Sequence, residues 1–134
     1  MKDKGELIMV FDKLFTQNRI LETAMQATQY KNQVILNNMA NIDTPNYKSK
    51  TVNFETALSR AIEETKETGV NHMDKVMPSL KVTTKQNSTT LDGNSIDIET
   101  EMIEFYKNST RYDFIVNSVL SNSNRTNIVY TTFK

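Results

Sequence analysis

The sequence predicts a mainly α-helical protein. Long N- and C-terminal helices are expected to pair as an elongated, coiled-coil-like unit, with a short helix and a loop or extended region between them. Two long segments near the chain ends carry apolar residues at helical spacing and contain no glycine or proline. Thr, Ser, Lys and Asn dominate the stretch between them. The 134 residues are only 37% hydrophobic, which is lean for a self-contained core.

The first helix is expected over about residues 10–42. The apolar residues that share its main arc are Phe11, Leu14, Leu21, Ala24, Met25, Ile35, Leu36, Met39 and Ile42. A second, thinner arc holds Ile20, Ala27, Tyr30 and Val34. A surface helix needs one apolar stripe, so two arcs predict a helix that contacts more than one neighbour. A helix in the middle of a small bundle fits the same periodicity.

A turn is expected directly after this helix. Pro45 disfavours the helical conformation at Thr44. Residues 44–47 then have proline at the second turn position and Asn46 at the third, where a type II turn needs a positive φ that asparagine tolerates. The first of three regions therefore covers residues 1–52.

The middle region, residues 53–91, opens with a predicted short helix capped by Asn53 and stopped by Gly69. Its apolar face consists of Phe54, Ala57, Leu58, Ala61 and Ile62. Beyond it, Val76, Leu80 and Val82 suggest a short extended piece within a segment that is otherwise expected to be a loop.

The third region, residues 92–134, follows a turn signal at residues 91–94. Asp97 is a suitable N-cap, and Glu99 and Glu101 place negative charge at the helix start, where the dipole favours it. The helix is expected to run to about Asn127. Its predicted seam keeps the 4-3 spacing of a coiled coil and consists of Met102, Phe105, Ser109, Tyr112, Val116, Val119 and Ser123.

Two helices of about 30 residues would each be about 45 Å long. Packed on one another, they would form a rod that leaves apolar surface uncovered, and such a surface calls for further partners. This reasoning predicts an assembly subunit. It leaves open a small cytosolic coiled-coil adaptor or chaperone, which would form a discrete dimer.

Composition excludes several other functions. Sixteen Lys and Arg balance sixteen Asp and Glu, whereas nucleic-acid binders usually carry a basic excess. The chain has no Cys and one His, His72, which lies in a polar stretch. No nucleophile, metal site or phosphate-binding loop can be assembled from these residues. We therefore expect no enzymatic activity, cofactor, metal or small-molecule substrate.

No membrane insertion is expected either. The apolar run at residues 7–11 is too short to span a bilayer, and Glu6 and Asp12 bound it. It is also short for the core of a signal peptide. A cytosolic protein, or one exported without a cleaved leader, fits these features.

The distinctive segment is Asn38-Met39-Ala40-Asn41-Ile42-Asp43-Thr44-Pro45-Asn46-Tyr47-Lys48. Helices rarely end with so many asparagines, because asparagine competes for backbone hydrogen bonds. Asn38 and Asn41 would lie on neighbouring turns, where they could bond a neighbouring backbone or each other.

This segment resembles the N-terminal signature of bacterial flagellar rod and hook proteins, in which an Asn-apolar-Ala-Asn pair precedes Thr-Pro-Gly-Tyr-Lys at the end of a long helix. Residues 92–97, Asp-Gly-Asn-Ser-Ile-Asp, followed by Glu101 and Met102, resemble the C-terminal part of the proximal-rod members. The match covers roughly residues 13–50 and 91–120. Asn46 replaces the usual glycine. The β-branched and aromatic stretch 127–134 departs from the family pattern and leaves the end of the last helix open.

The resemblance implies a structural subunit of the proximal flagellar rod. Such subunits polymerise through their terminal helices into the tubular drive shaft that transmits torque. Implied partners are further copies of itself, other rod subunits, base-adaptor and membrane-ring proteins, and the flagellar export apparatus, which exports rod proteins without a cleaved signal peptide to the basal body in the cell envelope. The expected assembly interface consists of Leu14, Leu21, Met25, Ile35, Asn38, Met39, Asn41, Ile42, Thr44, Pro45, Tyr47, Met102, Phe105, Tyr112, Val116 and Val119.

Overall fold

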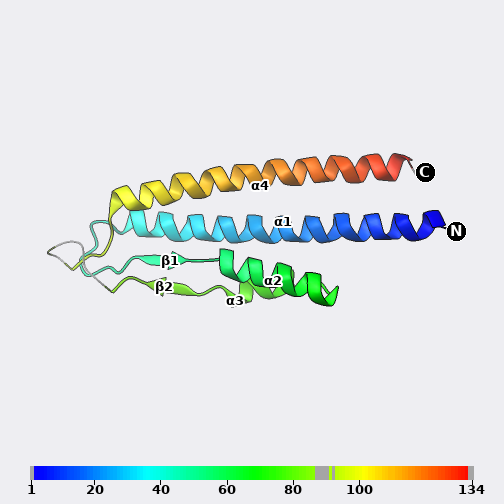
Figure 1. Cartoon of the computed structure of the whole chain (residues 1–134). Coiled ribbons are helices and arrows are strands. Elements are labelled where there is room, and N and C mark those ends of the chain that lie inside the picture. Colours follow the sequence, from blue (N-terminus) through cyan, green and yellow to red (C-terminus); the bar gives the residue numbers. More distant parts are fainter. Residues whose placement is uncertain (1, 87–90, 92, 133–134) are drawn as a thin grey trace.

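The computed structural model, which describes residues 2–86, 91 and 93–132, is an elongated helical molecule (Figure 1). Helix α1 (Lys2–Ala40) and helix α4 (Ile98–Thr132) lie side by side and run antiparallel over most of their length. A smaller layer packs along α1: strand β1 (Lys50–Val52), helix α2 (Glu55–Thr68), 3-10 helix η1 (Met73–Lys75), helix α3 (Val76–Ser79) and strand β2 (Val82–Thr84). The predicted fold class is confirmed.

Helix α1 is longer than the pattern indicated. It begins at Lys2 rather than near Val10 and therefore includes Gly5. A single glycine costs a helix about 1 kcal/mol but does not break it. The two arcs of α1 do contact different neighbours. Leu21 of the main arc faces α4, although Leu36 of the same arc is exposed, whereas Ala27 and Val34 on the second arc are buried and Ile20 packs against the middle layer.

The turn after α1 has the predicted geometry. The N–H of Tyr47 donates to the carbonyl of Thr44 at 3.3 Å. Asn46, at the third position, has a φ of 59°. It is the position at which the family signature carries glycine, and asparagine is among the residues that tolerate this conformation.

Helix α2 differs from the prediction at its start and agrees at its end. Its N-cap position is held by Phe54, without a side-chain capping bond, and not by Asn53. Phe54 is buried, and the Arg111 guanidinium lies 5.7 Å from its ring centroid, so tertiary packing outweighs the local capping preference. Gly69 ends the helix in the left-handed conformation, with φ 70°, and its N–H donates to Thr65.

The segment after Gly69 is more ordered than a loop. Val82 lies in an extended strand as expected, but Val76 begins helix α3 and was wrongly assigned to the extended piece. Met73 and Val76 are buried with Ala61 and pack against Ile20 of α1, a long-range contact that no local pattern indicates. Strand β1, which was not predicted, pairs antiparallel with β2, with Val52 opposite Val82.

Helix α4 starts as predicted and ends later. The Asp97 carboxylate accepts hydrogen bonds from the side chain of Thr100 and the backbone N–H of Glu99, and the bond from the Thr100 side chain lowers the pKa of Asp97 below its ordinary value. The helix passes the expected end near Asn127 and continues to Thr132. Of the turn expected at residues 91–94, Asp92 lies outside the described residues, and Gly93 has a φ of 80°.

The two exposed glycines provide a test of these backbone assignments. Gly69→Ala should lower the free energy of unfolding by about 1 kcal/mol, because alanine is strained at φ 70° even though nothing lies within 4 Å of the added methyl group. Gly5→Ala should raise it by about 0.5 kcal/mol, because α1 is an ordinary helix there. Urea unfolding followed by circular dichroism measures both. Changes of the same sign would contradict the assignments.

Candidate assembly surface

The signature segment is anchored by the buried side chain of Asn38, which has an exposed fraction of 0%. Its amide donates to the carbonyl of Lys50 at 2.7 Å and to the carboxylate of Glu101 at 3.0 Å. Its Oδ1 accepts from the N–H of Lys50 at 2.9 Å and from the hydroxyl of Tyr47 at 3.4 Å. One side chain thus joins α1 to β1, to the turn and to α4.

The end of α1 is completed by a second buried asparagine from the distant motif. The Nδ2 group of Asn94 donates to the carbonyls of Asn41, Ile42 and Thr44 at 3.1, 2.8 and 2.9 Å. These carbonyls belong to the turn that follows α1, so Asn94 holds this turn in place from across the chain. The backbone N–H of Asn41 donates to the carbonyl of Asn38 at 3.0 Å, but the side chain of Asn41 has other partners. That side chain donates to the carbonyl of Asn37 and accepts from Thr44.

The two motifs form one contiguous structure. The N–H of Ser95 donates to the carbonyl of Tyr47 at 3.0 Å, and the N–H of Ser49 donates to the Ser95 hydroxyl at 2.7 Å. Lys48 donates to the carbonyl of Gly93 at 2.7 Å. We call this structure the polar node; it comprises Asn38, residues 41–50, residues 93–97 and Glu101. The node closes one end of the helix pair.

Along the helix pair, the buried positions of α4 recur every seven residues: Glu101, Asn108, Ile115 and Asn122. Three of these four residues are polar, and each bonds to α1. Asn108 donates to the carbonyl of Thr28 and to the side chain of Asn32, both at 2.8 Å. Asn122 repeats this arrangement with the carbonyl of Leu14 and the side chain of Asn18. We call these two sets of bonds the asparagine ladder.

Of the seven predicted seam residues of α4, Met102 and Ser123 are exposed, and the other five are half-buried: Phe105, Ser109, Tyr112, Val116 and Val119. The alternate positions are shifted by one residue, because the structure buries Glu101, Asn108, Ile115 and Asn122 where the pattern selected Met102, Ser109, Val116 and Ser123. The physical reason is hydrogen bonding to α1, which an apolar pattern does not register.

One side of the helix pair is covered by the middle layer. Arg111 of α4 pairs with Glu55 of α2. Lys31 of α1 lies 3.5 Å from the carboxylate of Glu104 and 3.9 Å from that of Glu55. These ion pairs link α1, α2 and α4 on that side.

The opposite side carries exposed apolar residues and is bordered by a bond from Gln29 to the hydroxyl of Tyr112. On α1, Ile8, Phe15 and Leu36 occupy positions related by sevens, and Leu36 is 49% exposed. On α4, Met102 is 42% exposed, and Val116, four turns further along the helix, is half-buried. The exposed residues that define this open flank are Ile8, Phe15, Leu36, Met102, Tyr106 and Leu120, and the half-buried Val116 lies at its edge.

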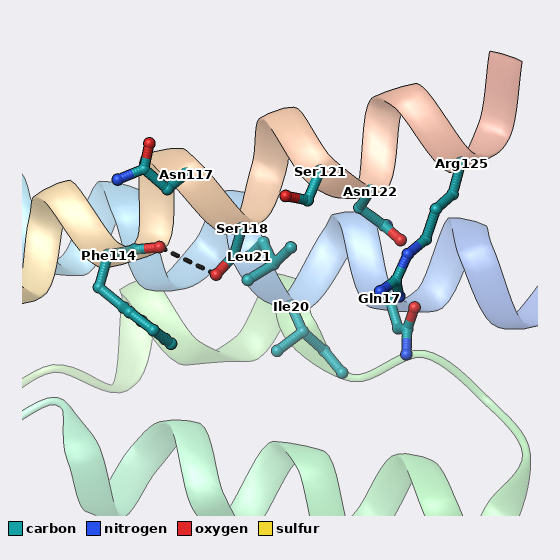
Figure 2. Close-up of a pocket in the computed structure, with 9 residues that line it drawn as sticks. All are labelled: Gln17, Ile20, Leu21, Phe114, Asn117, Ser118, Ser121, Asn122 and Arg125. Atoms are coloured by element: carbon teal, nitrogen blue, oxygen red, sulfur yellow. Dashed lines mark hydrogen bonds between the residues drawn. The ribbon is translucent and has the colours of Figure 1, made fainter.

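A groove of about 520 Å³ lies between the two long helices on the other side (Figure 2). Ile20 and Leu21 of α1 face Phe114 and Ser118 of α4 across it. The one ionisable residue in its lining is Arg125, so the lining holds no acid–base pair and no base that could activate Ser118 or Ser121. The described residues contain no cluster of three or more His, Cys, Asp or Glu placed to hold a metal. Within the same residues, no helix has the length and apolarity to cross a membrane.

The expected interface residues fall into three groups. Those on the seam between α1 and α4 are Leu14, Leu21, Met25, Ile35, Met39, Phe105, Tyr112 and Val119. Those at the node are Asn38, Asn41, Ile42, Thr44, Pro45 and Tyr47, and those on the open flank are Met102 and Val116. Asn18, Asn32, Asn108 and Asn122, which bond across the helix pair, were not among the expected interface residues; Asn94 and Glu101 stood only in the segment that carries the resemblance. The 14-residue spacing of asparagines in both long helices was the available signal.

A long antiparallel helix pair, closed by a polar node and apolar along one flank, defines an elongated helical protein. The family model described as "Flagella basal body rod protein" matches residues 19–48. The flagellar basal body rod protein FlgB of Bacillus subtilis is 33% identical over 121 residues, which cover 83% of this chain and 90% of the relative.

Two further FlgB proteins match over a similar share of the chain at lower identity. The protein of Buchnera aphidicola is 27% identical over 82% of this chain and 93% of its own length. The protein of Escherichia coli is 23% identical over 82% of this chain and 89% of its own length. The chain belongs to the flagellar basal body rod protein family. It is a structural subunit of the basal-body rod, and its relatives are structural proteins rather than enzymes.

The polar node can be tested with two neighbouring asparagines. Asn38→Ala should lower the free energy of unfolding by about 2–3 kcal/mol, because it leaves the backbone of Lys50 and the carboxylate of Glu101 without their partner. Asn37→Ala is the matched control, because Asn37 is exposed and contributes only its backbone carbonyl. Urea unfolding gives both values. Equal effects of the two substitutions would show that the Asn38 contacts are dispensable.

Proposed function

We propose that copies of this chain polymerise through α1 and α4 into the proximal part of the rod, the tubular shaft that transmits motor torque. The observation that carries the proposal is the open flank. Leu36 and Met102 are 49% and 42% exposed, although each lies beside a seam that is buried. Exposed apolar residues that run along two paired helices are typical of a surface that associates with another protein.

The shape of the molecule supports a helical assembly rather than a closed dimer. Its node is at one end and the free helix ends are at the other (Figure 1). A contact between different surfaces of successive copies does not close on itself and builds an open helical array. The proposed contacts are the open flank and the seam and node residues named above.

Other partners are proposed on the basis of the family. They are other rod subunits, the base-adaptor and membrane-ring proteins, and the flagellar export apparatus, which would deliver the chain to the basal body without cleaving a signal peptide. The rival function, a small cytosolic coiled-coil adaptor or chaperone, receives no support from the comparisons. It would require a discrete soluble dimer.

Charge on the open flank should block assembly. Val116→Glu and Met102→Glu should each reduce swimming by at least about tenfold, because a buried unpaired carboxylate costs several kcal/mol at an apolar contact. Swarm diameter in soft agar and the presence of the chain in isolated basal bodies measure the effect. Thr110→Glu is the matched control, since Thr110 is an exposed residue of the same helix outside the flank.

Normal swimming by both flank variants, with the chain present in basal bodies, would contradict the interface assignment. Normal swimming after deletion of the whole gene would contradict the function itself.

A further inference from the structure

Helix α4 has two faces that could pair with α1, and both share Phe105, Tyr112 and Val119. The observed face adds Glu101, Asn108, Ile115 and Asn122 to these residues. The alternative face adds Met102, Ser109, Val116 and Ser123. Exchanging one face for the other requires a rotation of α4 by about 50°, half of the 100° that separates successive helical residues.

Apolar burial favours the alternative face. That face would bury a methionine, a valine and two small serines, whereas the observed face buries a carboxylate and two amides beside a single isoleucine. Burying polar groups is unfavourable unless they form hydrogen bonds. The observed orientation therefore needs a compensating interaction.

The asparagine ladder supplies that interaction in two equivalent places. Each ladder asparagine of α4 donates at once to a carbonyl of α1 and to the asparagine four residues further along α1. The bonds of Asn108 and Asn122 lie 14 residues apart on both helices, so the same geometry occurs twice at one rotational setting. Two such contacts at different heights on one face of α4 fix the rotation of the helix as well as its register.

The ladder is not arranged for greatest stability. The Oδ1 atom of Asn108 is buried and has no hydrogen-bond partner among the described residues. An unsatisfied buried acceptor is destabilising. Single buried asparagines are known to select one pairing of helices at a cost in stability. The unpaired Oδ1 atom is consistent with Asn108 serving to select one orientation of α4 on α1 rather than to add stability.

We propose that Asn108 and Asn122 are positioning residues that set the rotation of α4 on α1. They turn the polar face inward and thereby leave Met102 and Val116 on the open flank. The rotational setting itself does not depend on the proposed function. Only the use of the open flank by another subunit rests on it.

The sequence permits a test that preserves amino-acid composition, because each ladder asparagine of α4 is followed by a serine. The exchange Asn108→Ser with Ser109→Asn, combined with Asn122→Ser and Ser123→Asn, moves both amides to the alternative face. The matched control is Asn117→Ser with Ser118→Asn, which makes the same exchange at a position whose asparagine is exposed and bonds nothing on α1.

Rotation is read by disulfide formation, since the chain has no native cysteine. Met25 lies seven residues from both Asn18 and Asn32, so the ladder register places it opposite Ile115. One protein carries Met25→Cys with Ile115→Cys, and another carries Met25→Cys with Val116→Cys. Mild oxidation of the full chain, followed by mobility on a non-reducing gel, gives the rate for each pair, and circular dichroism reports helical content.

In the parent and in the control exchange, the pair with residue 115 should close at least about tenfold faster than the pair with residue 116, because disulfide geometry is restrictive. In the double exchange the order should reverse. If the double exchange loses its helices, the exchange at residues 122 and 123 alone is measured instead. It must lower the ratio of the closure rate with residue 115 to that with residue 116 at least about threefold. An unchanged preference for residue 115 after either exchange, or no preference in the parent, overturns the proposal. Either result would leave the rod function standing, because that function is tested by gene deletion and swimming.

Discussion

The two-point bond between the Asn38 side chain and the backbone of Lys50 is the contact on which the rest of the structure depends. The same amide donates to Glu101 in the first turn of α4. One buried side chain therefore fixes the positions of the end of α1, the start of strand β1 and the start of α4. Asn94 completes the junction by binding the turn after α1 from the other motif. The two signature segments, which lie about fifty residues apart, are therefore two halves of one structural element.

Polar contacts then continue along the helix pair. Asn108 and Asn122 hold α4 against α1 by hydrogen bonds, at positions where a coiled coil would ordinarily place apolar residues. Buried amides specify an orientation but contribute less stability than apolar packing. As a consequence, apolar residues that could have filled the seam, such as Met102, remain at the surface. In such a subunit the orientation of the helices is fixed but part of the apolar surface stays exposed. This suits a protein whose remaining apolar surface is buried against neighbouring copies.

Local signals were sufficient to predict the features that depend on local physics. Asp97 caps α4, Gly69 stops α2 and Asn46 occupies the left-handed turn position because each residue satisfies a requirement of its own backbone. The errors occurred where distant residues decide. Phe54 replaces Asn53 at the start of α2 because its ring is buried, and Val76 is helical because it packs under α1. The α4 seam was shifted by one residue because an apolar pattern cannot represent amides that bond across the pair. The resemblance located the node segments, but only the structure shows that they touch.

The central claim is that the flank left open in the single chain is covered in the rod. The most direct measurement is the rate of maleimide labelling of Leu36→Cys, which places a thiol on that flank of an otherwise cysteine-free chain. Labelling in isolated basal bodies should be at least about tenfold slower than in the purified chain, because thiol reactivity requires access. Equal rates in the two samples would show that the open flank faces solvent in the assembled rod, and would contradict the account.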